Sequence, residues 1–300
     1  MKPTKALAKS LIREKAEKVT VFISRGGQQL GSGVIIGQNG KTVYVLTASH
    51  VIGIRPGKVD TGNGTLETEN PYEVTTNNGQ KFKVGYSNYK IIVNPFSNNI
   101  DLAILKLDTS SKNIYKDEVA KLTSSLKKNM PVYIFGYLPC SPSAKVNKGK
   151  QDQFSNGKIF PVTSSSQFDS SDKLGGYDVN YNNNTIQGMS GSPVFDAAGR
   201  VVAIHAKTDK KKTYNSEVCL PLPSEPTPDY GDNSGISIKT FANLKSDWPD
   251  GLQSILEIDS SPVEEVKPDE PTPSPNPTQT TRREENCPPF IQPGEDCPGR

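Results

Sequence analysis

Short runs of alternating apolar and polar residues fill the centre of the chain. Residues 19–24 alternate with a period of two and end at glycines, as half-buried β-strands do. The apolar run 31–36 is followed by Gln38-Asn39-Gly40, a strong hairpin signal, and by a returning strand over 41–47. This pattern predicts an all-β fold, either a sandwich or a barrel. Further strands are expected at 81–86, 89–94, 101–107, 131–137, 157–164, 177–181, 193–195, 201–206 and 235–238.

Other segments lack the strand pattern. Residues 4–18 carry Ala, Leu and Ile among Lys and Glu, and predict a short amphipathic helix packed on the main body. Residues 240–257 hold a second helical pattern, interrupted by Trp248-Pro249-Asp250-Gly251. We expect polar loops over 53–80, a connector over 108–130 and a long Pro- and Ser-rich insertion between 206 and 235.

The end of the chain has a different composition. Residues 259–300 contain ten prolines, many Glu, Thr and Ser, and almost no aromatic residues. Such a segment cannot bury enough apolar surface to offset the entropy lost on ordering. We therefore predict a disordered Pro-rich tail after a folded body of about 1–258. The hydrophobic content of 33%, low for a globular chain, agrees with a part that does not fold.

Charge and hydropathy narrow the classes of partner. The net charge is only +3, which gives no reason to expect a nucleic acid. No stretch approaches the ~20 apolar residues of a membrane span. Residues 1–15 are basic but lack an apolar core, so no secretory signal peptide is expected and the default location is the cytoplasm.

Neither a zinc site nor a calcium site is predicted. None of the four cysteines, Cys140, Cys219, Cys287 and Cys297, lies in a Cys-X-X-Cys pair. Three pairings are open, and the short separation favours Cys287 with Cys297 in an oxidising compartment. Residues 58–70 are rich in Asn and Asp but lack the ligand spacing of a calcium loop. We therefore expect no metal and no cofactor.

The stretch Ile186-Gln187-Gly188-Met189-Ser190-Gly191-Ser192-Pro193-Val194-Phe195 places a serine between glycines. Gly188 and Gly191 permit a tight turn with positive φ. Such a turn can expose the Ser190 hydroxyl and aim the N–H groups of Gly188 and Ser190 into one space, as an acyl-transfer nucleophile requires. The alternative is an ordinary turn serine, because turns commonly use Gly and Ser.

A base and a carboxylate would complete this chemistry. The chain has two histidines, and His50 ends the apolar stretch 45–52 where small residues follow the strand. Asp101 opens the apolar strand 101–107. Each residue has a structural alternative, a strand-end histidine or a turn aspartate. Together, in the order His50, Asp101, Ser190, they predict a hydrolytic triad.

Three motifs resemble those of chymotrypsin-like serine peptidases. They are Thr47-Ala48-Ser49-His50, the strand opened by Asp101, and Gly188-Met189-Ser190-Gly191-Ser192-Pro193, separated by 51 and 89 residues from the histidine to the aspartate and from the aspartate to the serine. The resemblance covers about 19–246. It implies Ser190 as nucleophile, His50 as general base and then acid, Asp101 as the group that orients the imidazole, and an oxyanion hole of the Gly188 and Ser190 N–H groups. Met189 stands where animal digestive members carry an aspartate, so maturation by their buried ion pair is not expected.

The resemblance also implies a fold and its boundaries. The expected fold is all-β, with two antiparallel six-stranded Greek-key barrels. The expected domains are an N-terminal helical extension over 1–18, a first barrel over 19–115, a second barrel with a C-terminal helix over 116–258 and the tail over 259–300. A monomer acting on protein or peptide substrates is expected, and members of the family imply secretion or the periplasm as the alternative location.

The specificity pocket is most similar to that of the bacterial glutamyl endopeptidase branch. Members place Thr or Ser five residues before the nucleophile and His fifteen after it, and Thr185 and His205 occupy these positions. Asn184 stands where trypsin-type members carry an aspartate, so a preference for Arg or Lys is not supported. The S1 residues implied are Thr185, His205 and Asn184, with acidic residues preferred at P1. Lys207 and Lys210–Lys212 would attract acidic substrates.

Three other functions are weighed against an active peptidase. A protease–chaperone of the high-temperature-requirement type needs a PDZ-like module, for which 259–300 is too short and too rich in proline. A catalytically weak binding or adaptor module would use the same barrels and the Pro-rich tail as a ligand. A complete triad argues against this adaptor. The last alternative is a sandwich protein with chance motifs.

Overall fold

The computed structural model describes residues 2–53, 71–85, 88–91, 100–110, 114, 116–141, 151–160, 176–208 and 214–264. The chain divides into two compact units, Met1–Glu264 and Glu265–Arg300. The second unit, which contains most of the predicted tail and the expected Cys287–Cys297 bridge, lies outside the described residues, as do the Asn- and Asp-rich segment 58–70 and Lys210–Lys212. None of the helices in the described ranges is both long and apolar enough to span a membrane.

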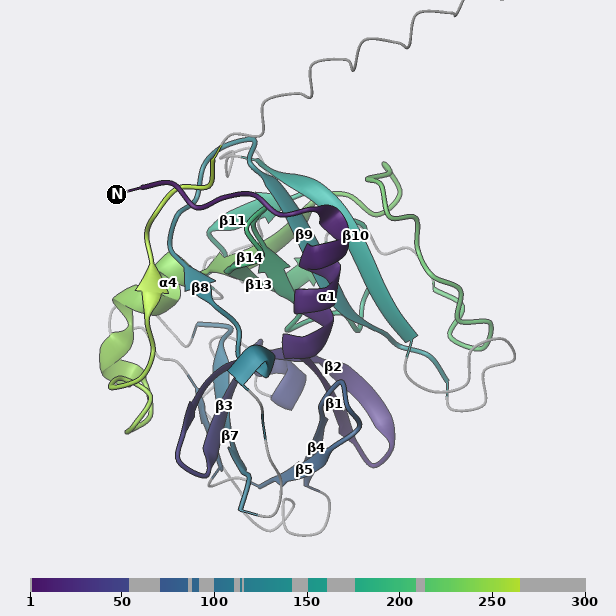
Figure 1. The fold of residues 1–300 in the computed structure, drawn as a ribbon. Helices are drawn as coiled ribbons and strands as arrows, with labels where there is room; N and C mark the ends of the chain where they lie inside the picture. The colour runs from purple at the N-terminus through teal and green to yellow at the C-terminus, as the bar shows by residue number, and fades with distance from the viewer. Residues whose placement is uncertain are drawn as a thin grey trace, which may run out of the picture. The chain divides into compact units, whose positions relative to one another are not determined.

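The first unit contains two sheets, and the first has the strand order β5-β4-β1-β2-β3-β7-β6 (Figure 1). All its pairings are antiparallel, and β4, β1, β2 and β3 lie in Greek-key order. The sheet has seven strands where six were expected. Its strands are β1 Thr20–Arg25, β2 Gln28–Asn39, β3 Thr42–Thr47, β4 Tyr72–Thr75, β5 Lys81–Val84, β6 Tyr89–Ile91 and β7 Ala103–Asp108.

The second sheet closes on itself. Its order is β12-β9-β10-β11-β14-β13-β8-β15, and β12 also pairs with β13, which joins six antiparallel strands in a ring. β12 lies beside β9 and so makes this a second Greek key. β8 and β15 add parallel pairings at the β13 edge. The strands are β8 Leu122–Thr123, β9 Pro131–Leu138, β10 Gln151–Phe160, β11 Val179–Tyr181, β12 Pro193–Phe195, β13 Val201–Thr208, β14 Asn233–Ser237 and β15 Ile258–Asp259.

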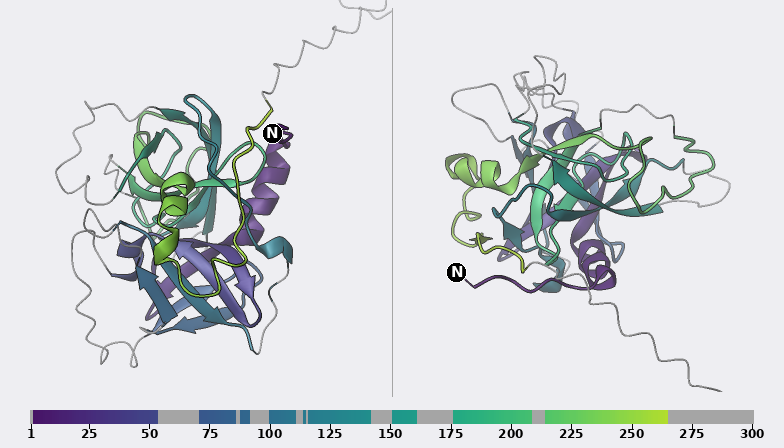
Figure 2. Two further views of the ribbon diagram at one scale, coloured as in Figure 1. Left: turned by 90° about the vertical axis from the view of Figure 1, so that its left-hand side faces the viewer. Right: turned by 90° about the horizontal axis from the view of Figure 1, so that it is seen from above.

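The all-β, two-barrel prediction is therefore confirmed, and Figure 2 shows the two sheets one above the other. Several strands were not predicted. β4 lies within the expected loop 53–80, and β8 within the expected connector. β10 begins six residues before the predicted 157, because its polar start is satisfied by hydrogen bonds: buried Gln153 exchanges bonds with the backbone of Leu222.

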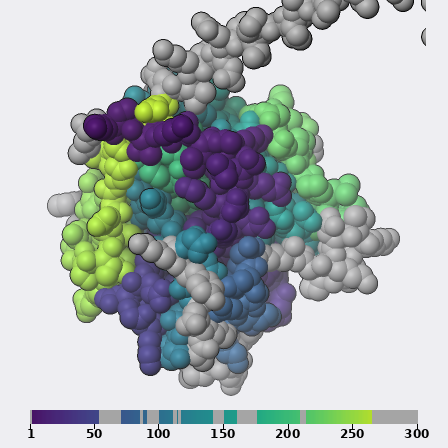
Figure 3. Space-filling view, in the orientation of Figure 1, coloured from purple at the N-terminus to yellow at the C-terminus, as the bar shows by residue number. Residues whose placement is uncertain are grey.

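The helices are shorter than predicted. α1 covers Lys9–Val19 and buries Ile12, Ala16 and Val19 at helical spacing in an apolar cluster formed by residues of both barrels. In the segment before α1, Thr4 pairs with Val263. Figure 3 shows this N-terminal segment, in dark purple, beside the yellow C-terminal end of the described chain. In place of one helix over 240–257, α4 ends after Ile238–Asn243, a single 3₁₀ turn covers Lys245–Asp247, and Trp248 stacks on Phe241.

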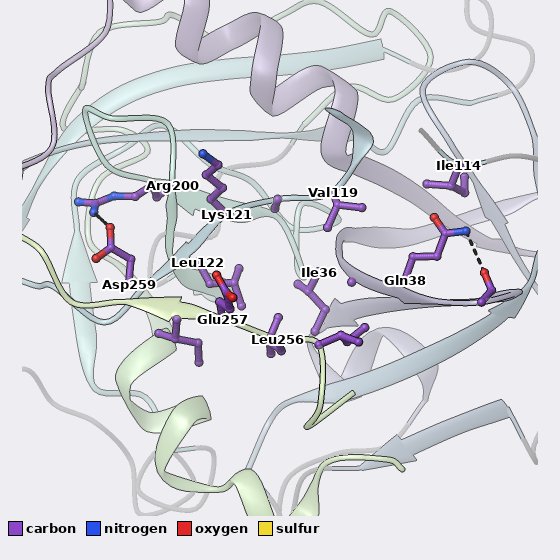
Figure 4. A pocket seen from close by; sticks show the side chains of 15 residues that line it. Ile36, Gln38, Ile114, Val119, Lys121, Leu122, Arg200, Leu256, Glu257 and Asp259 are labelled. Carbon is purple, nitrogen blue, oxygen red and sulfur yellow. Dashed lines mark hydrogen bonds and ion pairs between the residues drawn. The ribbon is translucent and has the colours of Figure 1, made fainter. Parts of the chain in front are cut away.

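Arg200 fastens both ends of the first unit to the hairpin between β12 and β13. Its side chain is 3% exposed and bonds Asp196, which is fully buried, through Nε at 2.8 Å. It also bonds Asp259 and Ser261 on the C-terminal side and Thr4 on the N-terminal side. Figure 4 shows the Arg200–Asp259 pair at one side of a cavity of 980 Å³ that is lined by Ile36, Leu122 and Leu256 among others.

Replacing Arg200 by methionine should destabilise the protein by about 3–5 kcal/mol, because Asp196 would be left buried and unpaired. Urea unfolding monitored by Trp248 fluorescence measures the change. The matched control is Lys9→Met, which removes an ion pair to Glu225 in which both side chains are exposed. The control should cost at most about 1 kcal/mol. Equal losses in the two variants would contradict the role given to Arg200.

Candidate active site

His50 and Asp101 are brought together by the pairing of β3 with β7. These strands are antiparallel, with Thr47 opposite Ala103. His50 lies three residues past Thr47, in the 3₁₀ turn Ser49–Ile52, and Asp101 lies two residues before Ala103. The end of one strand and the start of the other therefore meet at one edge of the first barrel. There His50 Nδ1 lies 2.7 Å from Asp101 Oδ2.

The Asp101 carboxylate is fully buried and accepts four hydrogen bonds. Oδ1 accepts from Ser49 Oγ at 2.8 Å and from the His50 backbone N–H at 3.0 Å. Oδ2 accepts from Tyr177 Oη at 2.8 Å, in addition to its bond with His50 Nδ1. The His50 side chain is 31% exposed, so the pair is dry at the carboxylate and open to solvent at the imidazole.

The Ser190 loop is docked on the first barrel through backbone contacts. Ser32 N–H donates to Ser190 O at 2.8 Å, and Thr47 Oγ1 donates to Ser32 O at 2.6 Å. Gly191, at φ +81°, lies so close to Ser32 O and Thr47 Oγ1 that no side chain would fit. Since Thr47 leads directly to His50, this docking places the serine loop beside the histidine turn.

Two backbone donors in the loop are left unused. The N–H groups of Met189, Gly191 and Ser192 bond to the carbonyls of Ile186, His205 and Met189. Within the described ranges, the N–H groups of Gly188 and Ser190 form no hydrogen bond. Gly188 has φ +101° and packs on Pro139, a conformation that favours glycine. The two donors expected from the sequence are therefore both open, and between Gly188 and Ser192 they are the two N–H groups without a partner.

Ser190 itself is not bonded to His50. Its Oγ lies 3.4 Å from Ala206 O, a long hydrogen bond. Gly31 lies between the two loops, since a Cβ placed there would meet Ser190 O at 2.6 Å and Val51 Cγ2 at 2.7 Å. Catalytic hydrogen bonds are often long or misaligned before substrate binds, so this arrangement does not argue against a triad.

His205 is deeply buried. Its side chain is 1% exposed, and Nδ1 lies 2.7 Å from Tyr181 Oη. Burial, with a smaller contribution from the nearby His50, lowers the pKa of His205 to about 3. Burial also raises the pKa of Tyr181 well above its usual range, so the tyrosine stays protonated. Without substrate, His205 is a neutral imidazole.

The other expected S1 residues have partners of their own. Thr185 is fully buried, and its hydroxyl donates to Asn233 Oδ1. Asn184 is also buried, and its amide holds the 223–227 segment: Nδ2 donates to Pro223 O and Glu225 O, and Oδ1 accepts from Thr227 N–H. Because both ends of its amide are occupied, Asn184 acts as a loop anchor in this structure.

Met189 is buried in an apolar cluster behind the serine loop. The cluster comprises Leu138, Ile186, Met189 and Leu222, with Tyr214 and Tyr230 packed against it. The Cys140–Cys219 disulfide joins two segments beside this cluster. This bond is compatible with only one of the three open pairings, the one whose second bond, Cys287–Cys297, lies outside the described residues. Packing of apolar side chains therefore holds the loop at Met189. An aspartate at the same position would need a buried positive partner.

Among the described residues, no group of three or more His, Cys, Asp or Glu side chains is placed to hold a metal ion. The 980 Å³ cavity of Figure 4 is lined by other residues than His50, Asp101 and Ser190.

Two antiparallel barrels with a His–Asp pair and a glycine-flanked serine at their seam define the chymotrypsin-like class of peptidase fold. Residues 31–204, more than half of the chain, match the family model of the trypsin-like peptidase domain, and the chain belongs to this family. Glutamyl endopeptidases from strains of Staphylococcus epidermidis are 28% identical to it over 204 residues, 65% of this chain. The chain covers 60% of the length of these curated relatives. The solved structure of Deg5 aligns with a TM-score of 0.47 at 16% identity, over 79% of this chain and 94% of Deg5.

Sequence reasoning missed the residues that support the site. Tyr177, Tyr181 and Asn233 contact the predicted residues but lie outside every motif, and Ser49 lies in the histidine motif without having been given a role. Of these four residues, only Ser49 could have been found from the sequence, because it directly precedes His50. The tyrosines arrive from β11 and the segment before it, so only the tertiary structure brings them to the site.

The buried neutral His205 should make stability depend on pH. Its pKa is about 3 when folded and about 6.5 when exposed, so the unfolded chain binds one more proton between these values. The free energy of unfolding should be fully present above about pH 6.5 and fall by up to about 1.4 kcal/mol per pH unit below it. Urea unfolding at several pH values measures this slope. His205→Gln should show a smaller slope, and an identical slope would refute the assignment.

Proposed function

We propose that the protein is a serine endopeptidase that cleaves peptide bonds through an acyl-enzyme, with Ser190, His50 and Asp101 as its triad. One observation carries this proposal: the serine loop leaves the Gly188 and Ser190 N–H groups unused, beside a histidine whose Nδ1 is bonded to a buried carboxylate. Family membership supports the general class of activity.

In the proposed mechanism, Ser190 Oγ attacks the substrate carbonyl while His50 Nε2 takes its proton. Asp101 holds His50 Nδ1–H, which fixes the imidazole tautomer and stabilises the cation as it forms. The carbonyl oxygen becomes an oxyanion that binds the Gly188 and Ser190 N–H groups. Each of these donors is worth about 3 kcal/mol of transition-state stabilisation. His50 then protonates the leaving amine, and water releases the acyl group by the same steps.

The serine nucleophile can be tested with a fluorophosphonate probe, which labels an activated serine. Wild-type protein should be labelled, and Ser190→Ala should not be. Ser254→Ala is the control, because its hydroxyl bonds Gly251 O on the exposed C-terminal segment. An unlabelled wild type would favour the alternative of a binding or adaptor module, and a labelled Ser190→Ala variant would exclude Ser190.

We further propose a preference for acidic P1 residues. Three observations support it: the identity with glutamyl endopeptidases, the position of Thr185 and His205 beside the serine loop, and Lys207 on the same strand as His205. When Tyr181 Oη donates to His205 Nδ1, and not to Ser234 O, the neutral imidazole carries its proton on Nε2 and can donate from it. The Thr185 hydroxyl would have to turn away from Asn233 to take part. Asn184 has no place in this proposal.

This preference predicts that kcat/KM for a peptide with Glu at P1 exceeds that for the Gln peptide by about 10–100-fold, the value of a hydrogen bond to a charged group. His205→Ala should abolish most of the difference while leaving fluorophosphonate labelling of Ser190 measurable. Tyr44→Phe, which removes a bond to Asp250 O, is the control and should retain the preference. Equal cleavage of Glu and Gln peptides by the wild type would refute the acidic pocket without touching the triad.

A further inference from the structure

We propose that Tyr177 is a positioning residue of the catalytic triad. Its hydroxyl reaches from the second barrel to the Asp101 carboxylate of the first and holds it in the orientation that directs His50. This inference rests on the proposed function and adds a residue that none of the sequence motifs contains.

The hydrogen bonds of Asp101 divide by their origin. Ser49 Oγ and the His50 N–H, which bond Oδ1, both belong to the turn that carries His50 and move with it. Tyr177 Oη bonds Oδ2, the same oxygen that contacts His50 Nδ1. Among the hydrogen bonds that the described residues donate to Asp101, the Tyr177 bond is the one that ties the orientation of the carboxylate to the second barrel.

Tyr177 is fixed on both sides. Gly176, at φ +73°, packs on Ile100, where a Cβ would come within 3.1 Å of Ile100 Cγ2. On the other side, the Asp178 carboxylate accepts bonds from Ser237 N–H at 2.7 Å and from Thr240 Oγ1 at 2.6 Å, at the start of α4. The segment 176–178 is therefore held at one end by Ile100, the residue before Asp101, and at the other end by the start of α4.

This placement has two chemical consequences. A donor on Oδ2 restricts rotation of the carboxylate and so keeps His50 Nδ1–H in line. The same donor also withdraws charge from the oxygen that stabilises the His50 cation. Loss of the hydroxyl should therefore lower kcat and, because the carboxylate then interacts more strongly with the imidazolium, move the acid limb of the kcat/KM profile to higher pH. Among the described residues, the charged or titratable groups that contact or influence His50 or its partner carboxylate are Asp101, Tyr177 and His205.

The test is Tyr177→Phe, assayed on a peptide substrate across pH. We expect kcat to fall by about three- to tenfold, as for one hydrogen bond, with KM within about twofold. The acid limb should move upward by a few tenths of a pH unit, and the low-field proton resonance of the His50–Asp101 bond should shift or broaden. Unchanged kcat, acid limb and resonance would overturn the inference.

Two further variants make the result specific. Tyr44→Phe removes a tyrosine hydrogen bond of 2.9 Å to Asp250 O and should leave all three readouts unchanged. Gly176→Ala keeps the hydroxyl but strains the segment that places it, and should move the acid limb in the same direction as Tyr177→Phe. Fluorophosphonate labelling separates the two proposals. Without labelling of wild-type Ser190 the proposed function fails, whereas labelling with an indifferent Tyr177→Phe variant defeats this inference alone.

Discussion

The structure around the site depends on keeping one buried carboxylate charged. Moving Asp101 out of water is costly unless both oxygens are hydrogen-bonded, and four donors supply these bonds. The donors come from the histidine turn and from the second barrel. The two barrels must therefore meet in one register for the carboxylate to be satisfied. The seam is set by this polar requirement as well as by the apolar core that residues of both sheets share.

The serine loop meets the same seam by a different principle. Its contacts with the first barrel include a hydrogen bond from the Ser32 N–H and a close approach that requires the absence of a side chain at Gly191. Behind it, Met189 contributes to an apolar cluster that needs no charged partner. The Gly188 and Ser190 N–H groups, proposed to bind the oxyanion, are open in this folded unit.

The residues that act through a local motif were predictable from the sequence, and those that act through tertiary contact were not. Short alternating runs predicted most strands, and strand ends located His50 and Asp101. β4 was missed although Tyr72 and Val74 alternate with polar residues, because the strand is only four residues long. The polar start of β10 and the short β8 and β15 were missed because hydrogen bonding and edge pairing rather than apolar periodicity define them. Asn184 was assigned to the pocket by alignment alone, yet its amide is occupied by the 223–227 segment. Nothing in the sequence marks Tyr177 or Tyr181, because only the fold places Tyr177 beside Asp101 and Tyr181 beside His205.

In the proposed S1 pocket, the protonation state of His205 would determine how an acidic P1 side chain is bound. A charged imidazolium would be costly at this buried position, and burial keeps His205 neutral. A neutral ring can still donate from Nε2 if its other nitrogen accepts, and a protonated Tyr181 hydroxyl at 2.7 Å is a suitable donor. An arriving carboxylate would also favour uptake of a proton by the ring. In neither case would His205 carry a positive charge before a carboxylate binds. The folded protein would therefore not have to bury an unpaired charge.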